Sequence, residues 1–258
     1  MLTIRYGNDT LALADALAIY RTAEWVAGLE HAREMNGGWR GMLQLTPELP
    51  VARYRRHLKY LRYAAEEMHR FFAAHAKEAT TAPQYRWQAL ELRFFRSVGR
   101  TTPSAYAHNW SVAYNVSGSL HKSANAVRET MFHEIFHLND AGWSAKTLQP
   151  IYAAIVKRCR RRSGKLSTPC LRAYAPHHTM VRGGTYYAFE PGNGVGEYAA
   201  ELALRYNREH RAQWLGAAPK AAFKCKNSDN ARAWKAIVDA LFAGVDAVPP
   251  CLKSPPAP

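Results

Sequence analysis

A His-Glu-x-x-His stretch at residues 133–137 most constrains what this chain can fold into. It lies in a run of residues that suits an α-helix, and residues four apart on a helix share one face, one turn above the other. Two imidazoles placed in this way can both reach one metal ion. The carboxylate of Glu134 then lies beside the ion without needing to bind it, which is the arrangement that a zinc hydrolase requires.

The pattern is short, and a shuffled chain of this composition would contain it about once in 40 attempts, so its context must decide. Ser123 is a suitable helix cap, and an apolar stripe follows it. The stripe consists of Ala124, Val127, Met131, Ile135 and Leu138. The two histidines and Asp140 fall on the opposite face. The spacing therefore predicts a helix from about 123 to 140 that buries one side and presents the histidines on the other.

Composition limits the class of protein. A chain of 258 residues can form one large domain or two lobes, and no run approaches the roughly 18 apolar residues of a membrane span. The net charge of +15 favours acidic partners, including acidic proteins or peptides. Basic residues gather in 53–62 and 157–165, but no zinc-finger spacing or basic zipper accompanies them, which disfavours a dedicated nucleic-acid reader. The charge pattern does not indicate an oligomeric state.

Four cysteines lie in polar or Pro-rich, loop-like sequence, and none forms a Cys-x-x-Cys pair. The simplest of the three possible connectivities pairs Cys159 with Cys170 and Cys225 with Cys251. Two disulfides would place the protein in an oxidising compartment, so we expect a secreted or exported protein. Residues 1–20 lack the plan of a signal peptide, so the chain would then be the mature form. Four unpaired thiols in a cytoplasmic protein are the alternative.

Periodicity and turn signals predict the elements around this motif. We expect three regions: an N-terminal helical region at 1–50, a lobe at 51–142 that carries the His-Glu-x-x-His helix, and a C-terminal helical lobe at 143–258 with a Pro-rich tail. The expected helices are 10–35, 51–77, 150–159, 197–210 and 231–242, and the expected strands are 85–97 and 105–117.

A hydrolytic zinc usually has three protein ligands. The residue six positions after His137 is Trp143, so a third histidine in the metzincin position is absent. Asp140 is better placed to orient an imidazole than to reach the ion. The other candidates are Glu197 and Glu201, one turn apart on an otherwise apolar helix, where paired carboxylates need a compensating cation. We expect Glu197 to bind zinc and Glu201 to accept a hydrogen bond from a ligand imidazole. In the alternative reading, Glu201 pairs with Arg205.

The combination of His133-Glu134-x-x-His137 with Glu197-x-x-x-Glu201 resembles the gluzincin metallopeptidases, the thermolysin-like clan, and is most similar to lethal-factor-type catalytic domains. This resemblance covers about 123–210 by motif. It implies an α+β, predominantly helical, zincin-like two-lobed fold with a small sheet. It also implies one Zn²⁺ per chain bound by His133, His137 and Glu197, with Glu134 as general base and a protein or peptide as substrate.

The sequence departs from that family in two places. Glu197 follows His137 by 60 residues, and Glu190 stands where lethal-factor relatives have a tyrosine. The oxyanion donor is therefore open, and Tyr187, Tyr186 and His178 are the candidates, in that order. By resemblance, the strand around 110–116 is expected to be an edge strand that pairs with an extended peptide.

Two other classes of function are compatible with the sequence. One is a basic binding protein for an anionic polymer or nucleic acid, with a vestigial His-Glu-x-x-His. The other is a zinc-stabilised structural module, which would need a closed four-ligand site that the cysteine spacing does not favour.

Overall fold

The computed structural model describes residues 1–38, 41–181, 183–217 and 221–252, and the end of the predicted Pro-rich tail lies outside them. The chain divides into two compact units, each with its own internal contacts. The first comprises Met1–Phe72 and Arg86–Leu138, and the second comprises Ala73–Tyr85 and Asn139–Pro258. Helices and a sheet are both present, so the predicted α+β class is confirmed.

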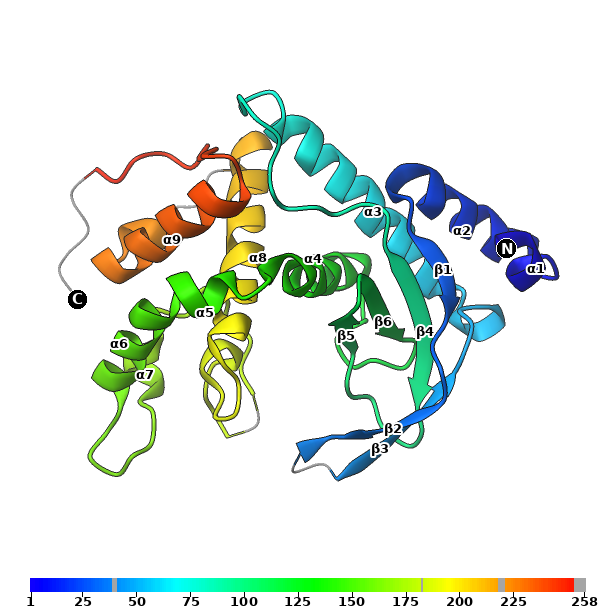
Figure 1. Ribbon diagram of the computed structural model, residues 1–258, viewed down its shortest axis with the longest axis horizontal. Coiled ribbons are helices and arrows are strands. Elements are labelled where there is room, and N and C mark those ends of the chain that lie inside the picture. Colours follow the sequence, from blue (N-terminus) through cyan, green and yellow to red (C-terminus); the bar gives the residue numbers. More distant parts are fainter. Residues whose placement is uncertain (39–40, 182, 218–220, 253–258) are drawn as a thin grey trace. The chain divides into compact units, whose positions relative to one another are not determined.

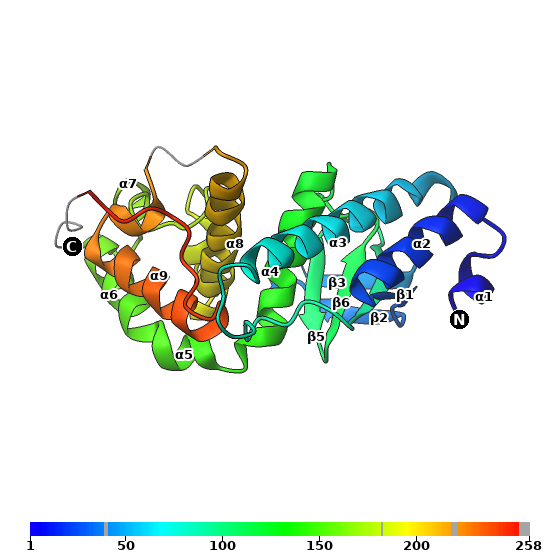
Figure 2. The ribbon, with the colours of Figure 1, turned by 90° about the horizontal axis from the view of Figure 1, so that it is seen from above.

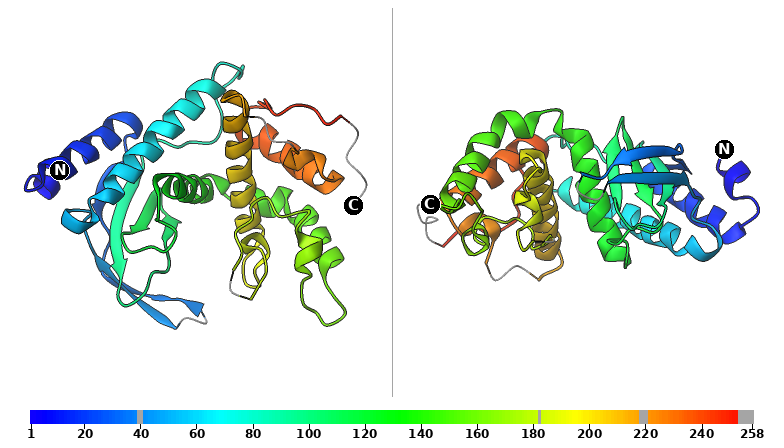
Figure 3. Two further views of the ribbon diagram at one scale, coloured as in Figure 1. Left: turned by 180° about the vertical axis from the view of Figure 1, so that it is seen from behind. Right: turned by 90° about the horizontal axis from the view of Figure 1, so that it is seen from below.

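The first unit is built on a curled sheet (Figures 1 and 3). Within the described residues it has six strands, in the order β2-β3-β4-β6-β5, with β1 also paired to β4. β1 and β6 run parallel to β4, whereas the other pairs are antiparallel. The strands are β1 (Val26–Leu29), β2 (Arg33–Asn36), β3 (Met42–Pro47), β4 (Glu91–Ser97), β5 (Ala105–His108) and β6 (Ser111–Asn115).

The predicted helical region at 1–50 also contains the strands β1, β2 and β3, so that prediction was only partly right. The helix predicted over 10–35 ends at Ala23, because Glu24 adopts a left-handed conformation that caps it. Trp25 then turns into the core and donates its indole N–H to the carbonyl of Trp87. The three-to-four spacing of the apolar residues had suggested one helix, but the short strands β1 and β2 follow it.

The strand predicted over 105–117 is a hairpin of β5 and β6. Asn109 and Trp110 both have positive φ values, 47° and 56°, as a two-residue hairpin turn requires. β6 is buried along its whole length between β4 and β5. The predicted edge strand at 110–116 is therefore wrong, and β5 is the edge of the described sheet on this side.

Helices cover this sheet, and their buried apolar side chains form its core together with those of the strands. In Figures 1 and 2, α2 and α3 lie side by side, and Arg62 of α3 bonds Asp15 of α2. The helix predicted over 51–77 is present as α3, and its apolar residues Leu58, Leu61 and Met68 are buried. The helices are α1 (Leu2–Tyr6), α2 (Thr10–Ala23), η2 (Ala52–Tyr54), α3 (Arg56–His75) and α4 (Ala124–Asp140).

The second unit is helical and contains two disulfides. Cys159–Cys170 and Cys225–Cys251 are bonded, so the predicted connectivity is confirmed. The helices predicted at 150–159, 197–210 and 231–242 are present with slightly different ends. The elements are α5 (Trp143–Thr147), α6 (Gln149–Cys159), α7 (Thr168–Leu171), η3 (Tyr187–Phe189), α8 (Val195–Trp214), η4 (Phe223–Cys225) and α9 (Ser228–Leu241).

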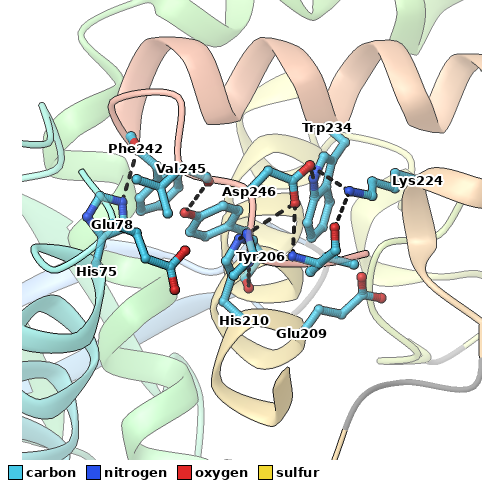
Figure 4. A network of polar contacts seen from close by, with 12 residues as sticks. His75, Glu78, Tyr206, Glu209, His210, Lys224, Trp234, Phe242, Val245 and Asp246 are labelled. Carbon is cyan, nitrogen blue, oxygen red and sulfur yellow. Dashed lines mark hydrogen bonds and ion pairs between the residues drawn. The ribbon is translucent and has the colours of Figure 1, made fainter. Parts of the chain in front are cut away.

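A polar network ties the end of the described chain to α8 and α9 (Figure 4). Asp246 accepts hydrogen bonds from the indole of Trp234 and from the Lys224 ammonium, at 3.0 and 2.6 Å. His210 on α8 accepts the N–H of Ala247, and its Nδ1 lies 3.0 Å from the carbonyl of Tyr206. Together with the Cys225–Cys251 disulfide, these bonds hold the segment after α9 against the helices.

A buried histidine in the first unit predicts acid sensitivity. His121 stacks on Tyr114, and burial lowers its pKa from 6.5 to about 4. Above pH 6.5 the ring is neutral in both folded and unfolded chains. As the pH falls from 6.5 to 4 only the unfolded chain gains the proton, so the folded state loses about 3 kcal/mol. Urea titrations at pH 7.5 and pH 4 should show a smaller pH dependence for His121→Gln than for wild type.

Replacement of an exposed histidine is the control for this prediction. His108→Gln, at the end of β5, should leave the pH dependence of the unfolding free energy as steep as in wild type. A His121→Gln protein that loses as much stability as wild type between the two pH values would contradict the assignment.

Candidate metal centre

The histidine pair is presented by α4 as the sequence predicted. Ser123 caps the helix by accepting the N–H of Ala126 at 3.2 Å. The predicted stripe is buried at Val127, Met131 and Ile135. This burial fixes the rotation of the helix, and the rotation sets the direction in which the histidines point.

The two imidazoles converge on one point. The Nε2 atoms of His133 and His137 are 3.2 Å apart, and the ring centroids are 4.9 Å apart. Two nitrogens bound about 2.0–2.1 Å from one tetrahedral zinc would lie about 3.3–3.4 Å apart. The observed separation therefore suits joint ligation of a single ion.

Glu134 lies next to His133 on the same helix turn and is half-buried. One residue along a helix corresponds to a rotation of about 100°, so Glu134 does not share the exact face of the two histidines. A carboxylate in this position can act on a water beside an ion bound by the pair.

Asp140 at the end of α4 binds the start of the next helix. Its carboxylate accepts hydrogen bonds from the backbone N–H and the hydroxyl of Ser144, at 2.7 and 2.6 Å. It thereby holds the start of α5 to the end of α4. The predicted role of Asp140 in orienting a ligand imidazole stays a prediction, because a carboxylate can accept further hydrogen bonds.

The first turn of α8 packs against the end of α4. A Cβ atom added at Gly196 would lie 3.8 Å from Asp140 Oδ2 and 4.0 Å from Ser144 Oγ. Glu197 follows Gly196 directly, in the first turn of α8, where the helix dipole favours a carboxylate. His137 precedes Asp140 by three residues, which is about one helical turn.

His133, His137 and Glu197 form a group that could hold a metal ion. One ring nitrogen of each histidine and one carboxylate oxygen of Glu197 all lie within 4.8 Å of one another. His133 is buried and the other two are half-buried. Two imidazole nitrogens and one carboxylate oxygen are a donor set suited to a divalent metal such as zinc, with room for a further ligand.

Glu201 is buried on α8 one turn after Glu197, and a neighbouring imidazole lies close to it. The Nδ1 atom of His177 is 3.4 Å from a carboxylate oxygen of Glu201. Arg205, the partner of Glu201 in the alternative interpretation, bonds Glu209 at 2.6 Å. The sequence analysis did not name His177, although the His177-His178 pair stands in an otherwise irregular segment. The role of Glu201 towards a ligand imidazole stays a prediction.

The three candidate oxyanion donors occupy two different places. Tyr187 begins η3, in which Phe189 contacts Tyr198 of α8 and stacks on Tyr152 of α6. Tyr186 and His178 instead line a common pocket, with ring centroids 6.3 Å apart. The structure thus separates Tyr187 from the other two.

Comparison with known protein families, characterised proteins and solved structures found no match to this chain. The chemistry of the metal-binding group must therefore be argued from its own residues.

Two further features concern the environment of the whole protein. The pair of disulfides indicates an oxidising environment. None of the helices in the described parts of the chain is both long and apolar enough to cross a membrane.

Proposed function

We propose that this protein is a zinc-dependent metallopeptidase. The observation that carries the proposal is the convergence of His133, His137 and Glu197 within 4.8 Å, with Glu134 beside the histidines on α4. Two histidines and a glutamate are a ligand set of hydrolytic zinc enzymes, in which three protein ligands leave a position for water. A zincin-like two-lobed fold is part of this proposal.

When bound, the zinc ion supplies a Lewis acid that lowers the pKa of water and polarises a carbonyl group. Glu134 takes the proton of the attacking water and later gives it to the leaving amine. Tyr187 is the candidate donor to the developing oxyanion, because η3 is held to the helix that carries Glu197. Glu197 and the two histidines hold the ion while these proton transfers take place.

The edge of the sheet offers a place for an extended substrate. β5 pairs with β6 on one side and is the terminal strand of the described sheet order. A peptide that adds to this edge would gain main-chain hydrogen bonds regardless of its sequence. We assign to β5 the substrate-pairing role that the sequence analysis gave to residues 110–116.

Metal content and peptide cleavage together test the proposal. We expect one zinc per chain by elemental analysis and cleavage of a mixed peptide library, with the activity lost on chelation and restored by added zinc. Zinc-free protein that binds anionic polymers without cleaving peptides would instead support the basic binding protein. Stoichiometric zinc without any cleavage would favour a structural site, although the described cysteines are all in disulfides and cannot complete one.

A further inference from the structure

The second unit contains an open pocket that the proposed chemistry does not use. Its volume is about 630 Å³. The lining residues come from α7 and from the segment before η3, and they are Thr168, Pro169, Arg172, His178, Met180 and Tyr186. The Cys159–Cys170 disulfide anchors α7, so one wall of the pocket is covalently fixed.

The ionisable groups at this pocket are basic. Arg172 is exposed in the wall, and Lys226 is half-buried nearby. Within the part of the chain that the structure describes, neither side chain forms an ion pair. The described residues that line the pocket include no carboxylate. Burial and the positive charges of Arg205 and Arg172 lower the pKa of the Lys226 ammonium more than Glu209 raises it, and an anionic ligand would offset that cost.

The electrostatics of His178 agree with this picture. Burial lowers its pKa, and the positive charges of Lys226, Arg205 and His177 lower it further. Arg205 is paired with Glu209, whereas Arg172 lines the pocket and Lys226 acts on the lining residue His178. The apolar walls formed by Pro169, Met180 and the ring of Tyr186 would pack against the aliphatic part of such a ligand.

Residues next to the pocket lie close to the helix that carries Glu197, within the second unit. His178 follows His177, which lies 3.4 Å from Glu201. Glu201 lies one turn after Glu197 on α8. Tyr186, which also lines the pocket, directly precedes Tyr187 of η3. A peptide cut at the metal centre could therefore place one of its side chains in this pocket.

We propose that this pocket is a specificity subsite that binds the carboxylate of an Asp or Glu side chain of the peptide substrate. Arg172 and Lys226 supply the positive charge, and Tyr186, Pro169 and Met180 form the apolar walls. As a substrate subsite it rests on the proposed peptidase function. The binding of an acidic side chain can be measured independently of cleavage.

The test uses the Glu134→Gln protein and decapeptides of Ala and Gly that carry one Glu at each successive position, with a matching Gln set. We expect Glu peptides to bind at least about tenfold tighter than their Gln counterparts at the preferred position, as a buried charge-assisted hydrogen bond implies. Arg172→Gln and Lys226→Gln should each remove most of this preference. Arg172→Glu should reverse it in favour of a Lys-containing set.

Arg161→Gln is the matched control. Arg161 is an exposed cation of the same unit, in the hairpin closed by the Arg160–Leu166 bridge and outside the pocket. The Arg161→Gln protein should keep the preference for Glu over Gln peptides. An equal loss of preference in it would show that general charge is responsible and would overturn the proposal.

Equal binding of the Glu and Gln sets by the Glu134→Gln protein would overturn the proposal too. Cleavage of both sets at equal rates by wild type would refute the subsite and leave the peptidase standing. An absence of cleavage with intact discrimination would refute only the peptidase.

Discussion

The Glu134→Gln protein is expected to retain its zinc and to lose peptide cleavage by about 10²–10⁴-fold, the usual contribution of a general base. Glutamine keeps the size of the side chain but cannot take a proton from water. The ligand atoms of His133, His137 and Glu197 are untouched by the change. Elemental analysis and steady-state cleavage of one library-selected peptide, measured on the same preparation, check both parts of the prediction.

The same chemical change at another half-buried glutamate is the control. Glu190 lies between η3 and α8, outside the metal-binding group, and Glu190→Gln should cleave at the wild-type rate. A Glu134→Gln protein that cleaves as fast as wild type would remove Glu134 from the mechanism. Loss of zinc in that variant would instead show that Glu134 supports the ion directly.

Local patterns accounted for the parts of the site that lie on one helix. The apolar stripe of α4 fixes its buried face, and the four-residue spacing of His133 and His137 then determines that their rings meet. The disulfides also followed from sequence, because each pairs cysteines that are close along the chain. In these cases the residues that interact are close together in the sequence, so the sequence pattern is enough to predict the contact.

The strands β1–β3 could not be predicted from local sequence patterns. Each has only four to six residues, and a few apolar positions fit both a helical and an alternating pattern. β1 and β3 pair with β4, which lies far along the chain, and β2 pairs with β3, so pairing rather than intrinsic propensity makes them strands. The turn at Asn109 was a readable signal, since asparagine tolerates a positive φ.

Contacts between distant segments decided the remaining features of the site. The approach of Gly196 to Asp140 depends on how α8 packs, and it does not follow from spacing. The same holds for the cations at the pocket, because Arg172 and Lys226 belong to different elements. The sequence therefore predicted the residues of the metal-binding group, whereas the proposed substrate preference rests on tertiary structure.

The His137→Ala protein is expected to bind zinc on the order of 10³-fold more weakly than wild type. Structural zinc sites in small peptides release about 10–16 kcal/mol on binding, and removal of one of three protein ligands forfeits a substantial share of such an energy. The Nε2 atom of His137 lies 3.2 Å from that of His133, so its loss leaves the other imidazole and Glu197 to hold the ion. Competition with a fluorescent zinc chelator measures the affinity directly.

His108→Ala is the control for zinc binding, since His108 is exposed at the end of β5 and belongs to no metal-binding group in the described residues. It should bind zinc as wild type does. Glu197→Ala should weaken binding comparably to His137→Ala if its carboxylate is the third ligand. Undiminished affinity in Glu197→Ala would exclude Glu197 from the ligand set. Undiminished affinity in His137→Ala would exclude the histidine pair as a joint binding site, and the proposed peptidase mechanism with it.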